Sequence, residues 1–316
     1  MTPTILVTSA SNKVQLVKSL THYGNVYGVK VITSDISVDA AALYFSHDHI
    51  LLPKLNSPEY ISTLTKLCQK KSIRYILPTR DGDLEFFTKH YTLFLDKNIV
   101  LLMSPPKTIE ICTNKHLFRK FCDDNNLPIP GKITDISRSF RPCVAKLAKS
   151  SASAGVFIVQ SKKDLDILLS RCSASELTFE ELISAKEYSI DAFHDNNGNL
   201  VGSVTRERIK VVNGESSISQ VVDAPLLSEL ARNLSKLIPF RGHITIQAFM
   251  DANSIYLIEV NPRFGGASNL SIQAGLASTE RLMASIVGDT ETLYRENELK
   301  IGLKMLRYSE DLFLNA

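Results

Sequence analysis

The sequence lacks several features that mark common classes of protein. Its 316 residues include five cysteines but no CxxC pair, which favours reduced, mostly buried thiols over a disulfide or zinc framework. No apolar run approaches the length that spans a bilayer, and the start, MTPTILVTSASNK, lacks the basic residues and apolar core of a signal peptide. We therefore expect a cytoplasmic protein with no membrane contact.

Basic residues are also not gathered into a block. The net charge of +3 comes from 36 basic and 33 acidic residues scattered along the chain, so a phosphate backbone has no obvious binding strip. We expect no nucleic acid partner. The sequence shows no internal repeat, and its 44% hydrophobic content suits a globular protein of two or three subdomains.

The first hundred residues alternate short apolar strands with amphipathic helices. Strands are expected at 4–8, 29–33, 73–79 and 99–103, and helices at 14–23, 60–69 and 84–94. This order predicts a doubly wound parallel sheet. The first strand is followed by TSASNK and not by GxGxxG, so a nicotinamide-dependent oxidoreductase is only a third alternative.

Two polar groups in this region have open roles. Arg80, Asp81 and Glu85 follow the third expected strand, at the edge where ligands of open α/β sheets bind, and they serve either a substrate or a helix cap. His47 and His49 could share one face of a strand and bind a metal, but no third ligand is near. We interpret the histidines as part of a strand edge.

The pattern changes after the paired prolines at 105–106. A helix is expected from Asn114, followed by strands and one helix up to about residue 182, and then by a set of mostly antiparallel strands. HDNNGN and DANS are the expected turns of two hairpins. The fold class is therefore α/β, with an α+β second region.

Glu259 in IYLIEVNPRFGG is unusual because it interrupts an apolar strand. A buried, unpaired carboxylate costs several kcal/mol, so it should be protonated, paired with a cation or bound to a metal. Gln247 and Asn261 stand at matching polar positions of the two neighbouring strands, and these oxygen-bearing side chains suit Mg²⁺. Arg263 follows, and Lys146 precedes the small-residue stretch AKSSASAGV, which together suggest a bound polyphosphate.

These segments in this order resemble an ATP-grasp enzyme, of the branch similar to the ATP-binding halves of carbamoyl-phosphate synthase large subunits. The resemblance runs over residues 104–270 through NKHLFRKFCDDNNLPIP, VAKLAKSSASAGV, FEELISAKEYSIDAF, GHITIQAF and IEVNPRFGG. It implies a Rossmann-like domain over 1–105, a small ATP-grasp lobe with the phosphate loop over 106–185, and a C-terminal lobe with the metal site over 186–316.

The resemblance also implies roles for individual residues. Lys115, Lys146, Ser151 and Ser153 would bind the phosphates, and Arg263 would stabilise the transferred phosphoryl group. Glu180 or its neighbour Glu181 would bind the adenine amino group, Leu182 would supply a backbone amide to adenine, and Glu187 would bind the ribose. Glu259, Asn261 and Gln247 would bind Mg²⁺ or Mn²⁺, with Gln247 also beside the nucleotide.

The strand that includes Arg206, Arg208 and Lys210 adds a row of alternating positive charges. The cluster could face a phosphate or a carboxylate substrate, or it could protect an exposed strand edge. The resemblance favours Arg208 as the catalytic arginine of this strand. His243 starts a strand near the expected metal site, where a structural role and a substrate contact are both open.

The function implied by the resemblance is a carboxylate-amine ligase. Such an enzyme phosphorylates a carboxylate with ATP and passes the acyl group to an amine or a related nucleophile. A non-catalytic ATP-binding sensor or subunit is the alternative. The resemblance leaves both substrates open, with amino acids as one option, and it leaves the oligomeric state open, with a homodimer as one option.

Overall fold

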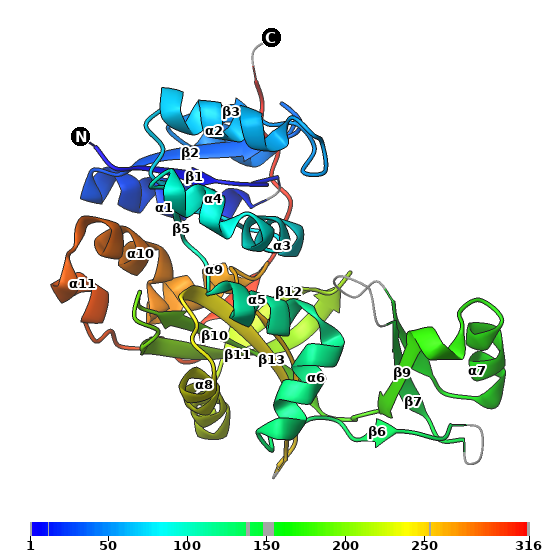
Figure 1. Ribbon diagram of the computed structural model, residues 1–316. Helices are drawn as coiled ribbons and strands as arrows, with labels where there is room; N and C mark the ends of the chain where they lie inside the picture. Colours follow the sequence, from blue (N-terminus) through cyan, green and yellow to red (C-terminus); the bar gives the residue numbers. More distant parts are fainter. Residues whose placement is uncertain (1, 12, 137–139, 148–154, 253, 315–316) are drawn as a thin grey trace.

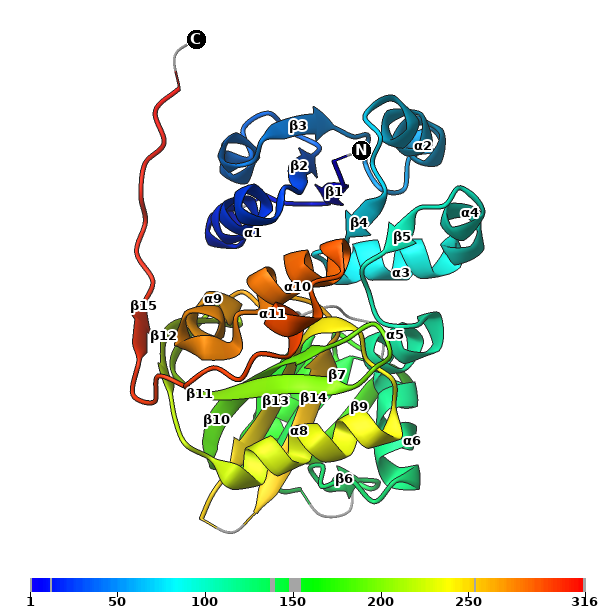
Figure 2. The same ribbon diagram turned by 90° about the vertical axis from the view of Figure 1, so that its left-hand side faces the viewer.

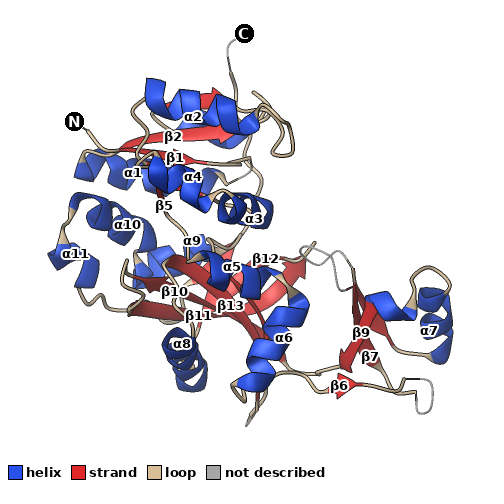
Figure 3. Cartoon of the chain, viewed as in Figure 1, coloured by secondary structure: helices blue, strands red, loops and turns tan. Residues whose placement is uncertain are grey.

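The computed structural model describes residues 2–11, 13–136, 140–147, 155–252 and 254–314 (Figure 1). Three sheets organise this chain, and Figure 3 shows helices around each of them. Within the described residues, none of the helices is long and apolar enough to cross a bilayer.

The N-terminal region is a parallel sheet, as predicted, and it has five strands in the order β3-β2-β1-β4-β5. Because side chains alternate between faces, Ile5 and Val7 pack on the side of α1 while Leu6 packs on the side of α2. The elements are β1 (Thr4–Val7), α1 (Val14–Tyr27), β2 (Lys30–Asp35), η1 (Ala41–Phe45), β3 (Asp48–Leu51), α2 (Tyr60–Lys70), β4 (Tyr75–Leu77), α3 (Asp81–Lys89), α4 (Tyr91–Asp96) and β5 (Val100–Leu101).

Two local predictions for this region can be compared with the structure. The helix expected over 84–94 is two helices, α3 and α4, because the backbone of His90 leaves the helical range between them. The segment with His49 is the edge strand β3, and His47 Nδ1 accepts a hydrogen bond of 2.9 Å from the Val31 amide. Among the residues that the structure describes, no group of three or more His, Cys, Asp or Glu side chains could hold a metal.

The middle region contains a sheet of four antiparallel strands in the order β6-β9-β7-β8. Cys143 and Ala145 of β7 pack with helix α7, so Val144 and Lys146 point to the opposite face. The elements are α5 (Pro106–Thr113), α6 (Lys115–Asp124), β6 (Lys132–Ile133), β7 (Cys143–Leu147), β8 (Val156–Val159), α7 (Lys162–Leu169), η2 (Ala174–Glu176) and β9 (Leu177–Glu181).

The third sheet has six antiparallel strands in the order β14-β13-β10-β11-β12-β15. Both predicted hairpins are confirmed, since β10 pairs with β11 and β13 pairs with β14. The elements are β10 (Lys186–His194), β11 (Leu200–Val212), β12 (Glu215–Val221), α8 (Pro225–Leu237), β13 (Gly242–Met250), β14 (Ile255–Asn261), α9 (Ser268–Ser271), η3 (Ile272–Leu276), α10 (Ser278–Val287), α11 (Thr290–Tyr294) and β15 (Lys304–Leu306).

One hydrophobic core joins the five-stranded sheet to the six-stranded sheet. Ile5 and Val7 of β1 belong to the same buried cluster as Phe193 of β10, Val204 of β11 and Phe264. The segment after β15 continues along the five-stranded region, where Glu310 lies 3.8 Å from Lys18 (Figure 2). This shared core holds the carboxyl ends of β1 and β4 close to the six-stranded sheet.

Helix α6 connects the middle region to the six-stranded sheet. The side chain of Asn114 accepts hydrogen bonds from the backbone amides of His116 and Leu117, which confirms the predicted helix start. Phe118 and Cys122 of this helix pack with β10, β13 and α8. The first residue of the helix, Lys115, is therefore fixed between two sheets.

Stability should depend on the buried histidine of β10. Burial lowers the pKa of His194 to about 4 from its ordinary 6.5, so the unfolded chain binds more protons between these pH values. Stability should therefore fall as the pH drops from 6.5 to 4, by about 3 kcal/mol for this group. Urea denaturation across this pH range checks the prediction. If the free energy of unfolding depends on pH in the same way in His194→Gln as in the wild type, the prediction is contradicted.

Candidate active site

A large cleft separates the six-stranded sheet from the four-stranded sheet. Its volume is about 1610 Å³, and all three regions of the chain line it. The described residues that the sequence analysis assigned to a site all border this cleft: Lys115, Lys146, Glu180, Glu181, Leu182, Glu187, Arg208, Gln247, Glu259, Asn261 and Arg263. Ser151 and Ser153 lie outside the described residues, so their assignment stays a prediction.

The floor of the cleft is one polar face of the six-stranded sheet. Gln247 pairs directly with Glu259 across β13 and β14, and Thr245 pairs with Asn261 in the next row. Cross-strand partners of an antiparallel pair share a face, so the three oxygen-bearing side chains of the expected metal site lie together. Asn261 Nδ2 donates a 2.8 Å hydrogen bond to Glu259 Oε1. This donor set suits a hard cation that also takes oxygens from a phosphate or from water.

Arg263 follows these donors and is held by the N-terminal region. Its Nε and Nη2 donate hydrogen bonds of 2.6 and 2.8 Å to the two carboxylate oxygens of Asp81, the first residue of α3. Nη2 also lies 3.2 Å from Asn261 Oδ1. Asp81, whose role was open, is therefore a bidentate partner of the expected catalytic arginine.

The turn after Arg263 needs a glycine at its first position. A Cβ on Gly265 would lie 2.8 Å from Oγ1 of the buried Thr245, which leaves no room for a side chain. A Cβ on Gly266 would lie 2.7 Å from the carboxyl carbon of Glu215, but that exposed and flexible side chain can move away. Ser268 Oγ accepts a 2.8 Å hydrogen bond from the Gly265 amide and fixes the turn from behind.

The opposite wall of the cleft carries two lysines. Lys146 Nζ lies 2.5 Å from Glu180 Oε2, and Arg119 Nη1 lies 3.4 Å from the other oxygen of Glu180. Lys115 Nζ donates a 3.0 Å hydrogen bond to the carbonyl of Leu147, and burial lowers the pKa of this lysine. The two lysines therefore meet at the carboxyl end of β7.

The structure separates the two acids that the sequence left as rivals. Glu180 and Lys146 lie on the same face of the four-stranded sheet, whereas Glu181 points to the other face. The carboxylate of Glu181 pairs with Arg141 at 3.2 Å and lies against Gly131. Glu180 is thus the acid that faces the interior of the cleft.

The two remaining predicted residues, Glu187 and Arg208, lie in contact with each other on the floor of the cleft. Glu187 Oε1 lies 3.1 Å from Arg208 Nε, and Arg208 Nη2 donates a hydrogen bond of 2.9 Å to the Gly214 carbonyl. Burial raises the pKa of Glu187, while the charge of Arg208 opposes this rise. Glu187, the acid expected at the ribose, and Arg208, the second arginine expected to be catalytic, are therefore ion-pair partners in this structure.

The row of three positive charges expected on one face of β11 is not formed. Register shifts on both sides of Lys210 disturb the alternation, and this lysine is exposed. Arg206 is instead buried and pairs with Asp191 at 2.9 Å. The sequence analysis missed Asp191, although EYSIDAF alternates polar and apolar residues and so places Glu187, Ser189 and Asp191 on one face.

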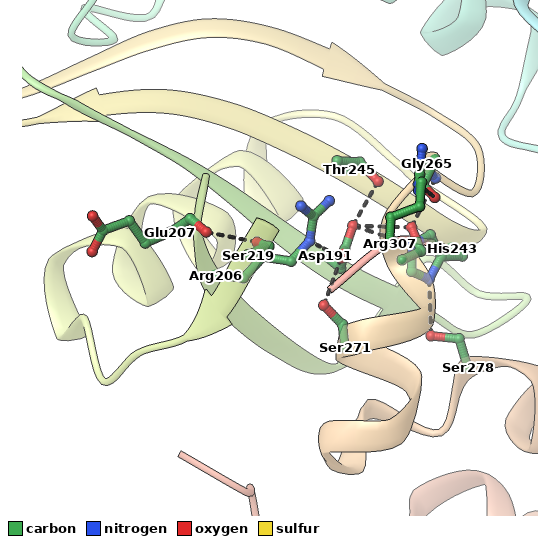
Figure 4. Close-up of polar contacts among 12 residues, drawn as sticks. Asp191, Arg206, Glu207, Ser219, His243, Thr245, Gly265, Ser271, Ser278 and Arg307 are labelled. Atoms are coloured by element: carbon green, nitrogen blue, oxygen red, sulfur yellow. Dashed lines mark hydrogen bonds and ion pairs between the residues drawn. The ribbon is translucent and has the colours of Figure 1, made fainter. Parts of the chain in front are cut away.

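Asp191 is the centre of a buried polar network behind the floor (Figure 4). Burial would raise the pKa of Asp191, but ion pairing with Arg206 and hydrogen bonding from His243 hold it well below its usual range. Its oxygens accept hydrogen bonds from the hydroxyls of Thr245, Ser268 and Ser271. Since Ser268 also binds the Gly265 amide, the network supports the turn that carries Arg263.

His243 has a structural position in this network. Its ring nitrogens lie 2.8 and 2.9 Å from the hydroxyls of Ser278 and Ser268, and the ring stacks on Phe264 at 4.3 Å. The side chain is fully buried. Of the two roles that the sequence left open, this geometry fits the structural one.

Two family models match the chain in separate segments. Residues 5–102 match the model for the PylC-like N-terminal domain, and residues 173–306 match the model for ATP-grasp in the biosynthetic pathway with Ter operon. The second segment contains β10 to β14, which form the floor of the cleft.

Solved structures share the fold over nearly the whole chain. N5-carboxyaminoimidazole synthetase from Staphylococcus aureus, complexed with ADP, is 19% identical with a TM-score of 0.75, over 95% of our chain and 80% of that chain. Biotin carboxylase from Campylobacter jejuni, in a beta-gamma-ATP complex, is 18% identical with a TM-score of 0.72, over 90% and 71%. Pyruvate carboxylase from Rhizobium etli is 14% identical with a TM-score of 0.75, and our chain covers 96% of its own length but 30% of that protein.

At sequence identities of 14 to 19%, the structural likeness shows the fold alone. The family model over residues 173–306 adds the assignment of that segment to ATP-grasp. The parallel sheet, the two antiparallel sheets and the cleft between them form one arrangement, and the model named ATP-grasp covers the floor of that cleft. The chain therefore combines a PylC-like N-terminal segment, residues 5–102, with an ATP-grasp segment, residues 173–306.

Proposed function

We propose that the protein is an ATP- and Mg²⁺-dependent carboxylate-amine ligase. It phosphorylates a carboxylate to an acyl phosphate, and an amine then displaces the phosphate. The observation that supports this most strongly is the meeting in one cleft of Lys115 and Lys146 with Glu259, Asn261 and Arg263. Phosphoryl transfer depends on positioning and charge neutralisation, which such a set provides without a protein nucleophile.

We assign the adenine end of the cleft to the segment after β9. Glu180 shares a face with Lys146, so the Glu180 carboxylate can accept a hydrogen bond from the adenine amino group while the lysine binds the α- and β-phosphates. Leu182 borders the cleft and supplies its backbone amide to the ring. Lys115, together with Ser151 and Ser153 from the stretch that follows β7 in the sequence, completes the proposed phosphate contacts.

The ribose and the phosphoryl group mark the two ends of the floor. Glu187 accepts hydrogen bonds from the ribose hydroxyls, and its ion-pair partner Arg208 binds a phosphate or substrate oxygen. Arg263 stabilises the transferred phosphoryl group, and its two hydrogen bonds to Asp81 fix the plane of the guanidinium.

The metal donors are Glu259, Asn261 and Gln247. Their side chains supply one carboxylate and two amide oxygens on one face of paired strands, which fits Mg²⁺ or Mn²⁺ shared with phosphate oxygens. When bound, such an ion neutralises phosphate charge and polarises the phosphoryl oxygens. The chain itself contributes the fixed donors and a cleft whose walls bear the balancing lysines.

The substrates that we propose are a small carboxylate and a small amine. Amino acids are the first class to test, and a homodimer is the first assembly to test. The loops after β1 and β4 border the region near Arg263, because the carboxyl ends of parallel strands meet at the sheet edge that faces the cleft.

Turnover tests the proposal directly. The protein with ATP and Mg²⁺ should release ADP in the presence of the correct carboxylate, and hydroxylamine should trap the acyl phosphate as a hydroxamate. A panel of amino acids and small acids is screened for both signals. Nucleotide binding with no turnover on any acid would favour a non-catalytic sensor, and no ATP binding in excess Mg²⁺ would reject the proposal.

Glu259→Gln should remove turnover without unfolding the protein. The variant loses the only carboxylate of the donor set, so the rate should fall about 100-fold or more. Glu259 is partly exposed in the cleft, so core packing stays as it is. Circular dichroism and ADP release are measured together, with Glu229→Gln on the outer helix α8 as the control. Wild-type turnover in Glu259→Gln would show that the metal assignment is wrong.

Glu180→Gln and Glu181→Gln should differ in nucleotide binding. Only Glu180 faces the interior, so its variant should weaken ATP binding roughly 10-fold, whereas the Glu181 variant should stay close to wild type. Calorimetric titration with ATP and Mg²⁺ compares the pair. Weaker ATP binding by the Glu181 variant than by the Glu180 variant would assign the adenine contact to Glu181.

Asp81→Asn should affect both stability and turnover. The Asp81 and Arg263 side chains are 24% and 19% exposed, a position between surface pairs and buried ones, so the cost should be about 2 kcal/mol. The rate should fall because the guanidinium is no longer fixed. Asp124→Asn, which removes an exposed partner of Lys120, is the control. Urea denaturation and ADP release measure both effects, and equal results for the two variants would contradict this role of Asp81.

A further inference from the structure

A polar row crosses the cleft floor from the metal donors to Arg206. Glu259 of β14 pairs with Gln247 of β13, which pairs with Ser189 of β10, which pairs with Arg206 of β11. All four side chains therefore share one face of the sheet, on which Glu259, Gln247 and Arg206 line the cleft and Ser189 is fully buried. Neighbouring strands are about 4.8 Å apart, so the backbone of Arg206 lies roughly 14 Å from that of Glu259 across the sheet.

Arg206 is held rigidly below this surface. Its Nε donates a 2.9 Å hydrogen bond to Asp191 Oδ2, and the two side chains are 2% and 0% exposed. Asp191 is fixed in turn by the hydroxyls of Thr245 and Ser271, as Figure 4 shows. The guanidinium therefore has one defined orientation before any ligand arrives.

Two buried polar groups of this row have no hydrogen-bond partner within the described part of the chain. They are Arg206 Nη1 and Ser189 Oγ, which belong to directly paired residues of adjacent strands. Arg206 also lines the cleft. A buried charged donor without a partner is rare, and its usual explanation is a water or a ligand that completes its hydrogen bonds.

The other arginines that line the cleft also form ion pairs: Arg119 with Glu180, Arg208 with Glu187, and Arg263 with Asp81 through two nitrogens. Within the described residues, the Nε atoms of Arg119 and Arg208 also lack a hydrogen-bond partner. Arg206 differs because its nitrogen without a partner is Nη1, at the end of the guanidinium, while its Nε is held by Asp191. It offers a fixed donor that the proposed reaction has not yet used.

The charge balance favours a carboxylate over a phosphate at this position. Asp191 already compensates the charge of Arg206, so the pair offers hydrogen bonds and little net positive field. A triphosphate, with several negative charges, is matched better by the lysines of the opposite wall and by the metal donors of β14. A singly charged carboxylate needs only hydrogen-bond donors that are held in a fixed orientation.

We propose that Arg206 and Ser189 form the subsite that binds the carboxylate of the acceptor substrate on the cleft floor. The subsite rests on the proposed function, since it places the group to be phosphorylated on the same floor as the metal donors. Arg206 Nη1 donates to a carboxylate oxygen, and Ser189 Oγ supplies a second hydrogen bond, directly or through one water.

The experiment uses the full chain loaded with ADP and Mg²⁺. Bicarbonate, acetate, succinate and the twenty common amino acids are titrated by calorimetry, and the strongest binder is then measured with Arg206→Lys. Lysine keeps a charge for Asp191 but removes the second nitrogen, so this affinity should fall at least about 10-fold. ADP affinity should stay within about twofold, since nucleotide contacts lie elsewhere. Arg232→Gln on helix α8, whose arginine pairs with Glu229 at the surface, is the matched control and should change neither value.

A second variant covers the case in which Arg206→Lys does not fold. The double change Asp191→Asn with Arg206→Gln removes both charges of the buried pair, so no charge is left without a partner. It should show the same selective loss of the carboxylate. Circular dichroism establishes that each tested variant is folded.

Each result has one meaning for the subsite. Loss of the carboxylate with ADP retained supports it, and retained carboxylate affinity overturns it. Equal losses of carboxylate and ADP overturn it as well, because Arg206 would then serve the nucleotide. A wild-type protein that binds ADP but no member of the panel also overturns the subsite and leaves the proposed function intact. Failure of ADP binding with a carboxylate response that depends on Arg206 would reject the proposed function and keep the subsite.

Discussion

Pairing of opposite charges is the constraint on which the whole cleft depends. A cation left alone in a partly buried site is costly, and most of the cations around this cleft have an acid within direct contact. The partners usually come from different elements, so each pair also ties two parts of the fold together. The pairs are Lys146 with Glu180, Arg208 with Glu187, Arg206 with Asp191, and Arg263 with Asp81.

This arrangement explains how a cleft with so many charges is stable without a ligand, and what a nucleotide must do to bind. In the proposed complex, Lys146 binds a phosphate and Glu180 binds the adenine amino group, so their ion pair separates and ATP replaces the partner of each side chain. The ion pair of Arg206 with Asp191 is different, since the hydroxyls that bind Asp191 hold the pair together. The exchangeable pairs lie where we place the nucleotide, and the fixed pair lies where we place the acceptor carboxylate.

Local sequence patterns predicted the parts of the site that depend on one strand or one hairpin. The alternation in IYLIEVN and the matching position of Gln247 were enough to bring the metal donors together, and Asn114 marked the start of its helix. The patterns could not show that Asp81 binds Arg263, because 182 residues separate them and only the packing of two sheets joins them. The network around Asp191 was missed for the same reason, since its partners come from three other segments, β11, β13 and α9. Our proposal of Glu180 over Glu181 rests on the strand register, and both this choice and the resemblance to carbamoyl-phosphate synthase, as a particular branch, stay predictions.

The most direct test of this account is a crystal structure with a non-hydrolysable ATP analogue and Mg²⁺. We expect the analogue in the cleft between the two antiparallel sheets, with Lys146 Nζ moved from Glu180 to a phosphate oxygen and with Glu259 and Asn261 bound to the same ion. Glu180 should then face the adenine amino group. A nucleotide bound at another place, or a cleft in which Lys146 and Glu180 remain paired beside the analogue, would contradict the account.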